Sequence, residues 1–154
     1  MYVQTKFTYL WPVMKKTESK YCSCLYYSSN ALARIMSKMS DEEFAHIGLS
    51  SSYAFLLMTV NEKQGIQPKE ISEQMQLTAS TVTRLIEKME YRGFLKRCSV
   101  GRSTEVYSTE AGLEMQHKIK EVWRNLNKRY TDVLGKEASN KLTSDIYAAV
   151  RKFE

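Results

Sequence analysis

Apolar residues recur at helical spacing in both end regions of the chain. Between Cys22 and His46 they include Leu25, Leu32 and Phe44, and this pattern predicts a first helix. The serines at 50–52 can cap a second helix that runs through Val60 and ends near Gly65. Near the other end, Met115, Ile119, Val122, Leu126, Tyr130 and Val133 predict a long helix that begins at Thr109–Glu110. After Gly135 the pattern resumes in a last helix through Phe153.

The centre of the chain changes pattern more often. Ile66–Gln67 can pair as a minimal strand, and Pro68 suits the first position of a short helix that contains Ile71 and Met75. After a tight connection at 76–78, Thr78 can cap a helix over 79–92, which Gly93 ends. The ranges 94–98 and 105–108 are predicted as two strands of a hairpin, with a basic tip at 99–104.

This order of elements predicts a mainly α fold with a small β-hairpin wing. We interpret 1–154 as a single domain: an N-terminal arm and dimerisation helix at 1–48, a winged helix-turn-helix core at 49–112, and C-terminal dimerisation helices at 113–154. The arm at 1–20 is expected either to pack on a partner subunit or to be a loosely ordered terminus. The long terminal helices have apolar positions that a symmetric partner would bury, which favours a homodimer over a monomeric bundle.

Composition and charge narrow the function classes. The chain has 6 Gly and 2 Pro in 154 residues, and 23 Lys and Arg against 17 Asp and Glu. The scarcity of turn formers disfavours an all-β fold, and the basic balance favours an anionic partner. Three cysteines cannot form a closed disulfide framework, and no metal-ligand spacing or long apolar run occurs. We therefore expect a cytoplasmic protein that has no cofactor, no metal and no membrane contact, and that is not an enzyme.

The helix over 79–92 has the features of a DNA-reading helix. Val82, Leu85, Ile86 and Met89 form an apolar stripe, whereas the other side is polar. Within 79–104, six basic residues oppose two acidic ones, a net charge of +4, as phosphate binding requires. An exposed helix and hairpin could instead carry these charges only for solvation. We expect double-stranded DNA to be contacted by Ser80, Thr81, Thr83, Arg84, Lys88, Arg97 and Arg102.

These segments also carry a resemblance. The stretch Ile71–Arg97, which includes STVTRLIEKMEYRGFLKR, resembles the core of MarR-type regulators, and Gly101–Gly112 resembles their wing and the start of the next helix. The resemblance covers about 49–112. It implies a homodimer whose terminal helices interleave and whose two winged lobes read a pseudo-palindromic operator, with Arg102 in the minor groove. The wing departs from the family pattern because Ser99, Val100 and Gly101 precede Arg102 where the family carries Asp residues.

The segment around Cys22 resembles the first helix of organic-hydroperoxide sensors within the same family. Cys22 matches the reactive cysteine and Tyr26 matches the tyrosine one turn later, so on a helix they would share a face. Tyr53 could supply a second phenol. The small residue of the sensor pattern is here Cys24, and the further tyrosine is not evident near Met36. A buried structural thiol or another thiol role remains the alternative for Cys22.

Two other function classes compete with a DNA-binding regulator. A winged helix used only for protein contact would be expected to lose the exposed Arg84 face, and a thiol-dependent enzyme would need a resolving site that the sequence does not show. We therefore expect a sequence-specific transcriptional regulator, a repressor relieved by thiol oxidation, by an organic hydroperoxide, or by a small phenolic or amphipathic ligand. The 10 Tyr and 8 Met residues suit a ligand cleft, and they suit core packing equally well.

Overall fold

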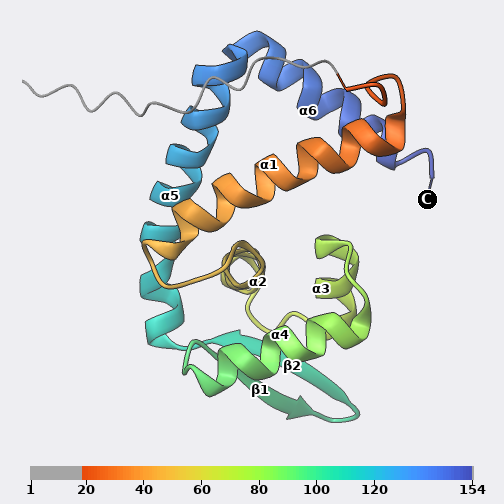
Figure 1. Cartoon of the computed structure of the whole chain (residues 1–154). Coiled ribbons are helices and arrows are strands. Elements are labelled where there is room, and N and C mark those ends of the chain that lie inside the picture. The colour runs from red at the N-terminus through yellow and green to blue at the C-terminus, as the bar shows by residue number, and fades with distance from the viewer. Residues whose placement is uncertain (1–18, 154) are drawn as a thin grey trace, which may run out of the picture. The chain divides into compact units, whose positions relative to one another are not determined.

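The computed structural model describes residues 19–153 and divides the chain into two compact units, 1–36 and 37–154. Helix α1, Leu25–Ala45, begins in the first unit and ends in the second. The elements that follow it are α2 (Ser51–Glu62), α3 (Pro68–Met75), α4 (Ala79–Tyr91), β1 (Leu95–Val100), β2 (Ser103–Ser108), α5 (Glu110–Leu134) and α6 (Lys136–Val150), as Figure 1 shows. The expected mainly α fold with a hairpin wing is confirmed. The arm at 1–20, except for Ser19 and Lys20, lies outside the described residues.

The helix-turn-helix in the second unit follows from local signals in the sequence. Pro68 occupies the first turn of α3, and the side chains of Gln67 and Glu70 form a capping box with the backbone. Gln76 takes a left-handed conformation with φ of 52°, which ends α3 and turns the chain toward α4. Thr78 then caps α4, because its side chain accepts a hydrogen bond from the Thr81 N–H at 3.3 Å.

The hairpin is longer and its turn shorter than the sequence pattern predicted. β1 and β2 pair antiparallel from Leu95 opposite Ser108 to Val100 opposite Ser103, so only Gly101 and Arg102 form the turn. Gly101 has a φ of 60°, in the left-handed region, whereas the φ of Arg102 is not positive. A two-residue hairpin turn of this geometry requires glycine at its first position. The predicted tip at 99–104 is therefore too long at both ends, because residues 99–100 belong to β1 and residues 103–104 to β2. Ile66 bridges Val106, which confirms the minimal strand expected there.

Two helix boundaries also differ from the prediction. The first helix begins at Leu25 and not at Cys22, because residues 20–23 form a turn in which the Ser19 hydroxyl accepts from the Tyr21 N–H and the Cys22 N–H donates to the Ser19 carbonyl. The last helix ends at Val150, before Phe153. Gly135 separates α5 from α6, which leaves the end of α5 at an angle in Figure 1.

The core of the second unit lies where α2, α3, α4, α5 and the base of the hairpin meet. Its fully buried side chains come from every one of these elements and from Phe44, and they include Leu56, Leu57, Ile71, Ile86, Met89, Val106 and Ile119. This core holds α4 and the hairpin on a rigid base. Among the described residues, no helix is both long and apolar enough to cross a membrane.

Candidate nucleic-acid interface

Helix α4 is held to the core by one face and leaves the opposite face to solvent. Val82, Ile86 and Met89 are at most 1% exposed, whereas the polar residues on the other side are exposed. This division confirms the apolar stripe predicted for α4 and leaves five predicted DNA contacts in solvent: Ser80, Thr81, Thr83, Arg84 and Lys88. A helix fixed by one side with its other side free is the arrangement that entry into a major groove requires.

The hydroxyls at the start of α4 already have partners within the protein. The Thr83 hydroxyl donates to the Ala79 carbonyl at 2.9 Å, and the Thr78 hydroxyl lies 3.1 Å from that of Ser80 and 2.8 Å from that of Thr81. These bonds fix the orientation of the short side chains. A hydroxyl that donates internally can still accept a hydrogen bond from outside. These positions are therefore suited to close approach rather than to strong base discrimination.

Arg84 and Lys88 are the cations that α4 itself offers. The ammonium of Lys88 lies 5.6 Å from the centre of the Tyr91 ring, whereas Arg84 forms no ion pair or hydrogen bond within residues 19–153. Tyr91, which the sequence reading did not select, is 86% exposed. It follows Ser80 and Arg84 at helical spacing, and that spacing could have identified it. Arg84 and Tyr91 thus extend one exposed face along the whole helix.

The two other arginines near α4, Arg92 and Arg97, form contacts within the protein. Arg97 pairs with Glu90 at 2.7 Å, and its N–H donates to the same carboxylate at 2.8 Å, which fastens β1 to α4. Arg92 donates to the Gly48 carbonyl at 2.8 Å and stacks on the Phe94 ring at 5.2 Å. The sequence reading counted both as phosphate-binding charge. In this structure Arg97 acts as a brace for the hairpin, and Arg97 as a DNA contact stays a prediction.

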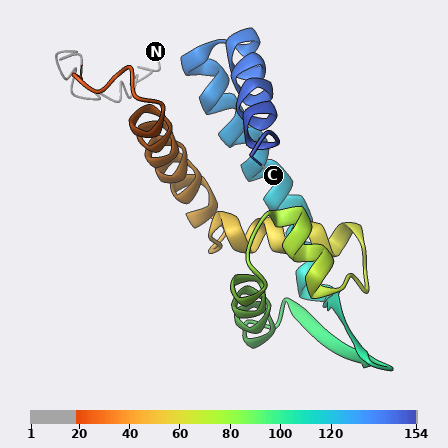
Figure 2. The same cartoon turned by 90° about the vertical axis from the view of Figure 1, so that its right-hand side faces the viewer.

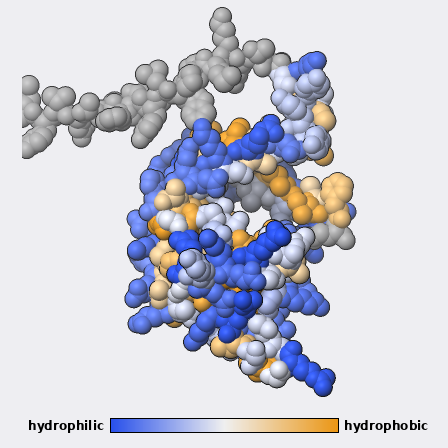
Figure 3. Space-filling model, turned by 60° about the horizontal axis from the view of Figure 1, so that its bottom comes forward, coloured by the Kyte–Doolittle hydropathy of each residue, from blue (hydrophilic) through white to orange (hydrophobic). Residues whose placement is uncertain are grey.

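Arg102 occupies the tip of the hairpin, next to Gly101. Its side chain is exposed, and it forms no ion pair within the described residues 19–153, in keeping with the absence of neighbouring Asp residues in the sequence. Figure 2 shows the hairpin projecting away from the helices of its unit, and Figure 3 shows hydrophilic side chains gathered on the face that includes α4 and the hairpin. Arg102 is thus free to reach a surface that α4 contacts.

A polar network anchors the base of the hairpin to α2 and α5. The Asn61 amide donates to Gln116 Oε1 at 2.8 Å and to the Gly112 carbonyl at 3.3 Å, and its oxygen accepts from the Ser108 hydroxyl. Nearby, the Tyr107 hydroxyl donates to Glu105 Oε2 at 2.6 Å, and this bond raises the pKa of the phenol. The sequence pattern gave no signal for this network, because its members are distant along the chain.

Two of the three proposed sensor residues, Cys22 and Tyr26, were predicted to lie on one helix, and the structure does not place them on one. Cys22 is exposed in the turn that precedes α1, so it does not share a helical face with Tyr26, which lies in the first turn of α1 and is 78% exposed. The prediction that both residues lie on the first helix is therefore wrong, because α1 begins at Leu25. Tyr53 lies in α2 and packs against the core of the second unit. Their role in sensing stays a prediction.

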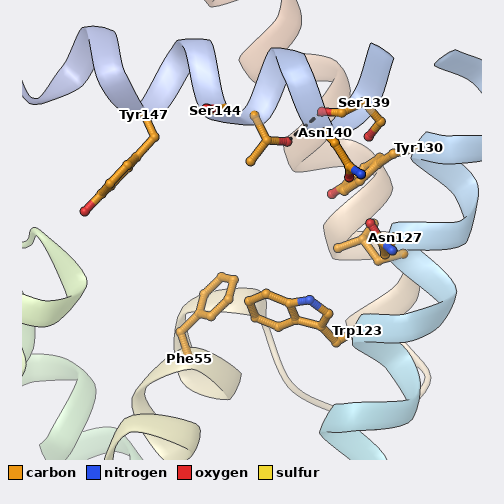
Figure 4. A pocket seen from close by; sticks show the side chains of 10 residues that line it. Phe55, Trp123, Asn127, Tyr130, Ser139, Asn140, Ser144 and Tyr147 are labelled. Atoms are coloured by element: carbon orange, nitrogen blue, oxygen red, sulfur yellow. Dashed lines mark hydrogen bonds between the residues drawn. The ribbon is translucent and has the colours of Figure 1, made fainter. Parts of the chain in front are cut away.

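A pocket of about 530 Å³ lies between α2, α5 and α6 in the second unit. In Figure 4, Phe55 and Trp123 lie together on one side, and Tyr147 extends from α6 on the other. The Phe55 and Trp123 rings meet edge to face, with centroids 5.0 Å apart. Burial raises the pKa of the Tyr130 phenol. The remaining lining is mainly amide and hydroxyl: Leu126, Asn127, Ser139, Asn140, Thr143 and Ser144.

Known proteins share this fold and its central sequence. Residues 49–99 match the model of the MarR family. The HTH-type transcriptional regulator PapX of Escherichia coli is 27% identical, over 56% of this chain and 61% of PapX, so the chain spans less than two thirds of that relative.

Several solved structures have the same fold as this protein over most of its chain. The S. aureus MepR–DNA complex matches with a TM-score of 0.73 and 14% identity, over 83% of this chain and 97% of that one. PcaV from Streptomyces coelicolor, in complex with its natural ligand, matches with a TM-score of 0.77 and 14% identity, over 88% and 98%. Residues 49–99 of the chain thus match the MarR family, and the chain as described has the winged helix-turn-helix fold of these solved structures.

Proposed function

We propose that the protein is a sequence-specific DNA-binding transcriptional regulator that acts as a homodimer, rather than an enzyme. The observation that carries the proposal is the exposed face of α4, on which Arg84 has no partner among the described residues 19–153, together with Arg102 at the hairpin tip, which forms no ion pair with any of those residues. Helix α4 would enter the major groove of double-stranded DNA, and Arg102 would reach the flanking minor groove. Such a regulator works where the DNA is, so the proposal places it in the cytoplasm.

The proposed homodimer is supported by apolar side chains that α5 and α6 leave in solvent. Val133 is 79% exposed, Ile146 44% and Val150 40%, and Phe153, which follows α6, is 89% exposed. Such a concentration at the end of a chain costs free energy unless another surface covers it. A second copy would cover it symmetrically and would place two α4 helices on the two halves of a pseudo-palindromic operator.

Fluorescence anisotropy tests the DNA proposal. The full chain is titrated onto labelled duplex from its own upstream region, with excess random duplex as competitor. We expect binding that resists the competitor, and a loss of about 1–3 kcal/mol of binding free energy in Arg84→Ala because a guanine contact disappears. Arg102→Ala should weaken binding mainly through the flanks of the half-site.

Arg124→Ala is the matched control, because it removes the same charge from an exposed position of α5. If Arg84→Ala and Arg102→Ala bind no more weakly than this control, α4 and the hairpin do not contact DNA as proposed. Binding that the competitor abolishes would instead favour a winged helix that serves protein contact.

We propose that a signal relieves repression, and the pocket of Figure 4 supports a small ligand as that signal. Its volume falls in the range of small-molecule sites, and its aromatic and amide lining suits a phenolic or amphipathic compound. Trp123 in the lining provides a fluorescence readout for a panel of phenols, with Trp123→Phe as the control. A compound that releases DNA but leaves Trp123 fluorescence unchanged would place the signal elsewhere.

The alternative signal is oxidation of Cys22 by an organic hydroperoxide. The thiol is exposed, as a reactive cysteine must be. Cys22→Ser should bind DNA normally and resist release by the hydroperoxide, whereas Cys98→Ser, which removes another exposed thiol, should respond like the parent protein. Release that persists in Cys22→Ser would remove Cys22 from the mechanism, and with it the proposed contributions of Tyr26 and Tyr53.

A further inference from the structure

Glu87 is an acidic residue at the centre of a face that is otherwise suited to DNA. The α4 positions 80, 84, 87 and 91 follow steps of four, three and four residues, so Ser80, Arg84, Glu87 and Tyr91 form one stripe. This stripe lies opposite the buried side chains Val82, Ile86 and Met89. Glu87 therefore faces the same partner as the other side chains on the exposed side of α4.

The Glu87 carboxylate has no partner in the part of the chain that the structure describes. Arg84 lies three residues earlier, yet the two form no ion pair, and Glu87 forms no hydrogen bond to any of residues 19–153. Glu90, one turn away, differs because it holds both the guanidinium and the N–H of Arg97. Folding of the described unit thus does not account for an acid at position 87.

A carboxylate on this face costs affinity for DNA, because phosphates repel it. It gains free energy in the major groove only where a base donates a hydrogen bond, which cytosine and adenine do through their amino groups. Cytosine suits a carboxylate better, because the amino group of adenine lies beside the N7 lone pair, which repels the second carboxylate oxygen. Against the carbonyl of thymine or guanine it meets only lone pairs. The acid therefore lowers general DNA affinity and rejects wrong bases, which is how specificity rather than affinity is increased.

We propose that Glu87 is a specificity-determining residue that accepts a hydrogen bond from a cytosine amino group in each operator half-site, beside the base that Arg84 reads. This inference rests on the proposed function, and it adds a base preference that the cations of α4 alone would not produce. The guanidinium and the carboxylate, three residues apart on one stripe, would read neighbouring positions of the half-site.

The test begins with selection of preferred sites for the full parent chain from a library of random duplexes. Affinity is then measured for all four bases at each half-site position, for the parent protein, Glu87→Ala and Glu87→Gln. Glu114→Gln on α5 is the matched control, since Glu114 is also exposed and has the same charge. Circular dichroism checks that each variant is folded.

We expect Glu87→Ala to bind random duplex several-fold more tightly and to lose about tenfold discrimination at one position, where the parent requires cytosine. Glu87→Gln should shift that position toward adenine, because an amide both donates to and accepts from that base. If the parent binds selected sites but Glu87→Ala keeps its full base profile, the inference is wrong and the proposed function stands. If the parent shows no preference over random duplex, the proposed function fails and the inference fails with it.

Discussion

At the scale of single residues, the structure assigns different tasks to side chains that look alike in the sequence. Arg84, Arg92 and Arg97 all contribute to the basic centre, but only Arg84 is left without an internal partner, among described residues 19–153. Gly112 likewise looks like an ordinary glycine in a helix start. An added Cβ there would lie 2.2 Å from the Phe94 carbonyl oxygen, which is closer than atoms can approach.

Gly112→Ala should therefore destabilise the protein strongly, by at least the roughly 1–3 kcal/mol typical of overpacking, because a backbone carbonyl cannot move aside as a flexible side chain can. Urea unfolding followed by circular dichroism measures the loss. Glu114→Ala, at an exposed position of the same helix, is the control and should change stability by less than about 0.5 kcal/mol. Equal midpoints for the two variants would show that α5 can shift away from Phe94.

At the scale of elements, local signals in the sequence set where the helices of the centre begin and end. Pro68 and the capping box begin α3, Gln76 ends it, and Thr78 begins α4. These features were predictable because they depend on neighbours in sequence. The hairpin turn was not located correctly, since pairing of Val100 with Ser103 extends the ladder up to Gly101 and depends on contact between two strands.

The cap of α4 gives a prediction at this scale. Thr78→Ala should lower the free energy of unfolding by about 1 kcal/mol, because the Thr81 N–H loses its acceptor. Ser50→Ala is a matched control, since Ser50 precedes α2 at the same cap position but its side chain makes no capping bond. Chemical denaturation compares the two variants. A loss in Ser50→Ala as large as in Thr78→Ala would show that the hydroxyl bond is not the cause.

At the scale of the whole described unit, contacts between distant segments hold the helices around the winged core. Arg129 on α5 donates to Glu42 at 2.8 Å and to Glu43 at 2.9 Å, and both carboxylates lie near the end of α1. The hydrogen bond from Arg129 lowers the pKa of Glu42 below its ordinary value. The ion pairs join segments almost ninety residues apart, so they contribute only when the tertiary structure is formed.

This arrangement predicts a dependence of stability on pH. Because the folded-state pKa of Glu42 is lowered, its contribution is present above about pH 4.3 and is lost as the pH falls further. Glu42→Gln should therefore show a shallower loss of stability in acid than the parent protein, in urea titrations at several pH values. Asp145→Asn, which removes an exposed pair within α6, should keep the parent's acid dependence. Parallel curves for the parent and Glu42→Gln would contradict the prediction.

The sequence by itself determined the helices, the winged core and the polar face of α4, because these follow from the spacing of apolar residues and from caps within a few positions. It also identified the exposed Arg84 and Arg102. Only the tertiary structure showed that Arg97 braces the hairpin, that Asn61 joins α2, β2 and α5, and that Cys22 precedes α1. These features depend on which atoms meet across the fold or on competing turn hydrogen bonds, and neither is encoded in periodicity.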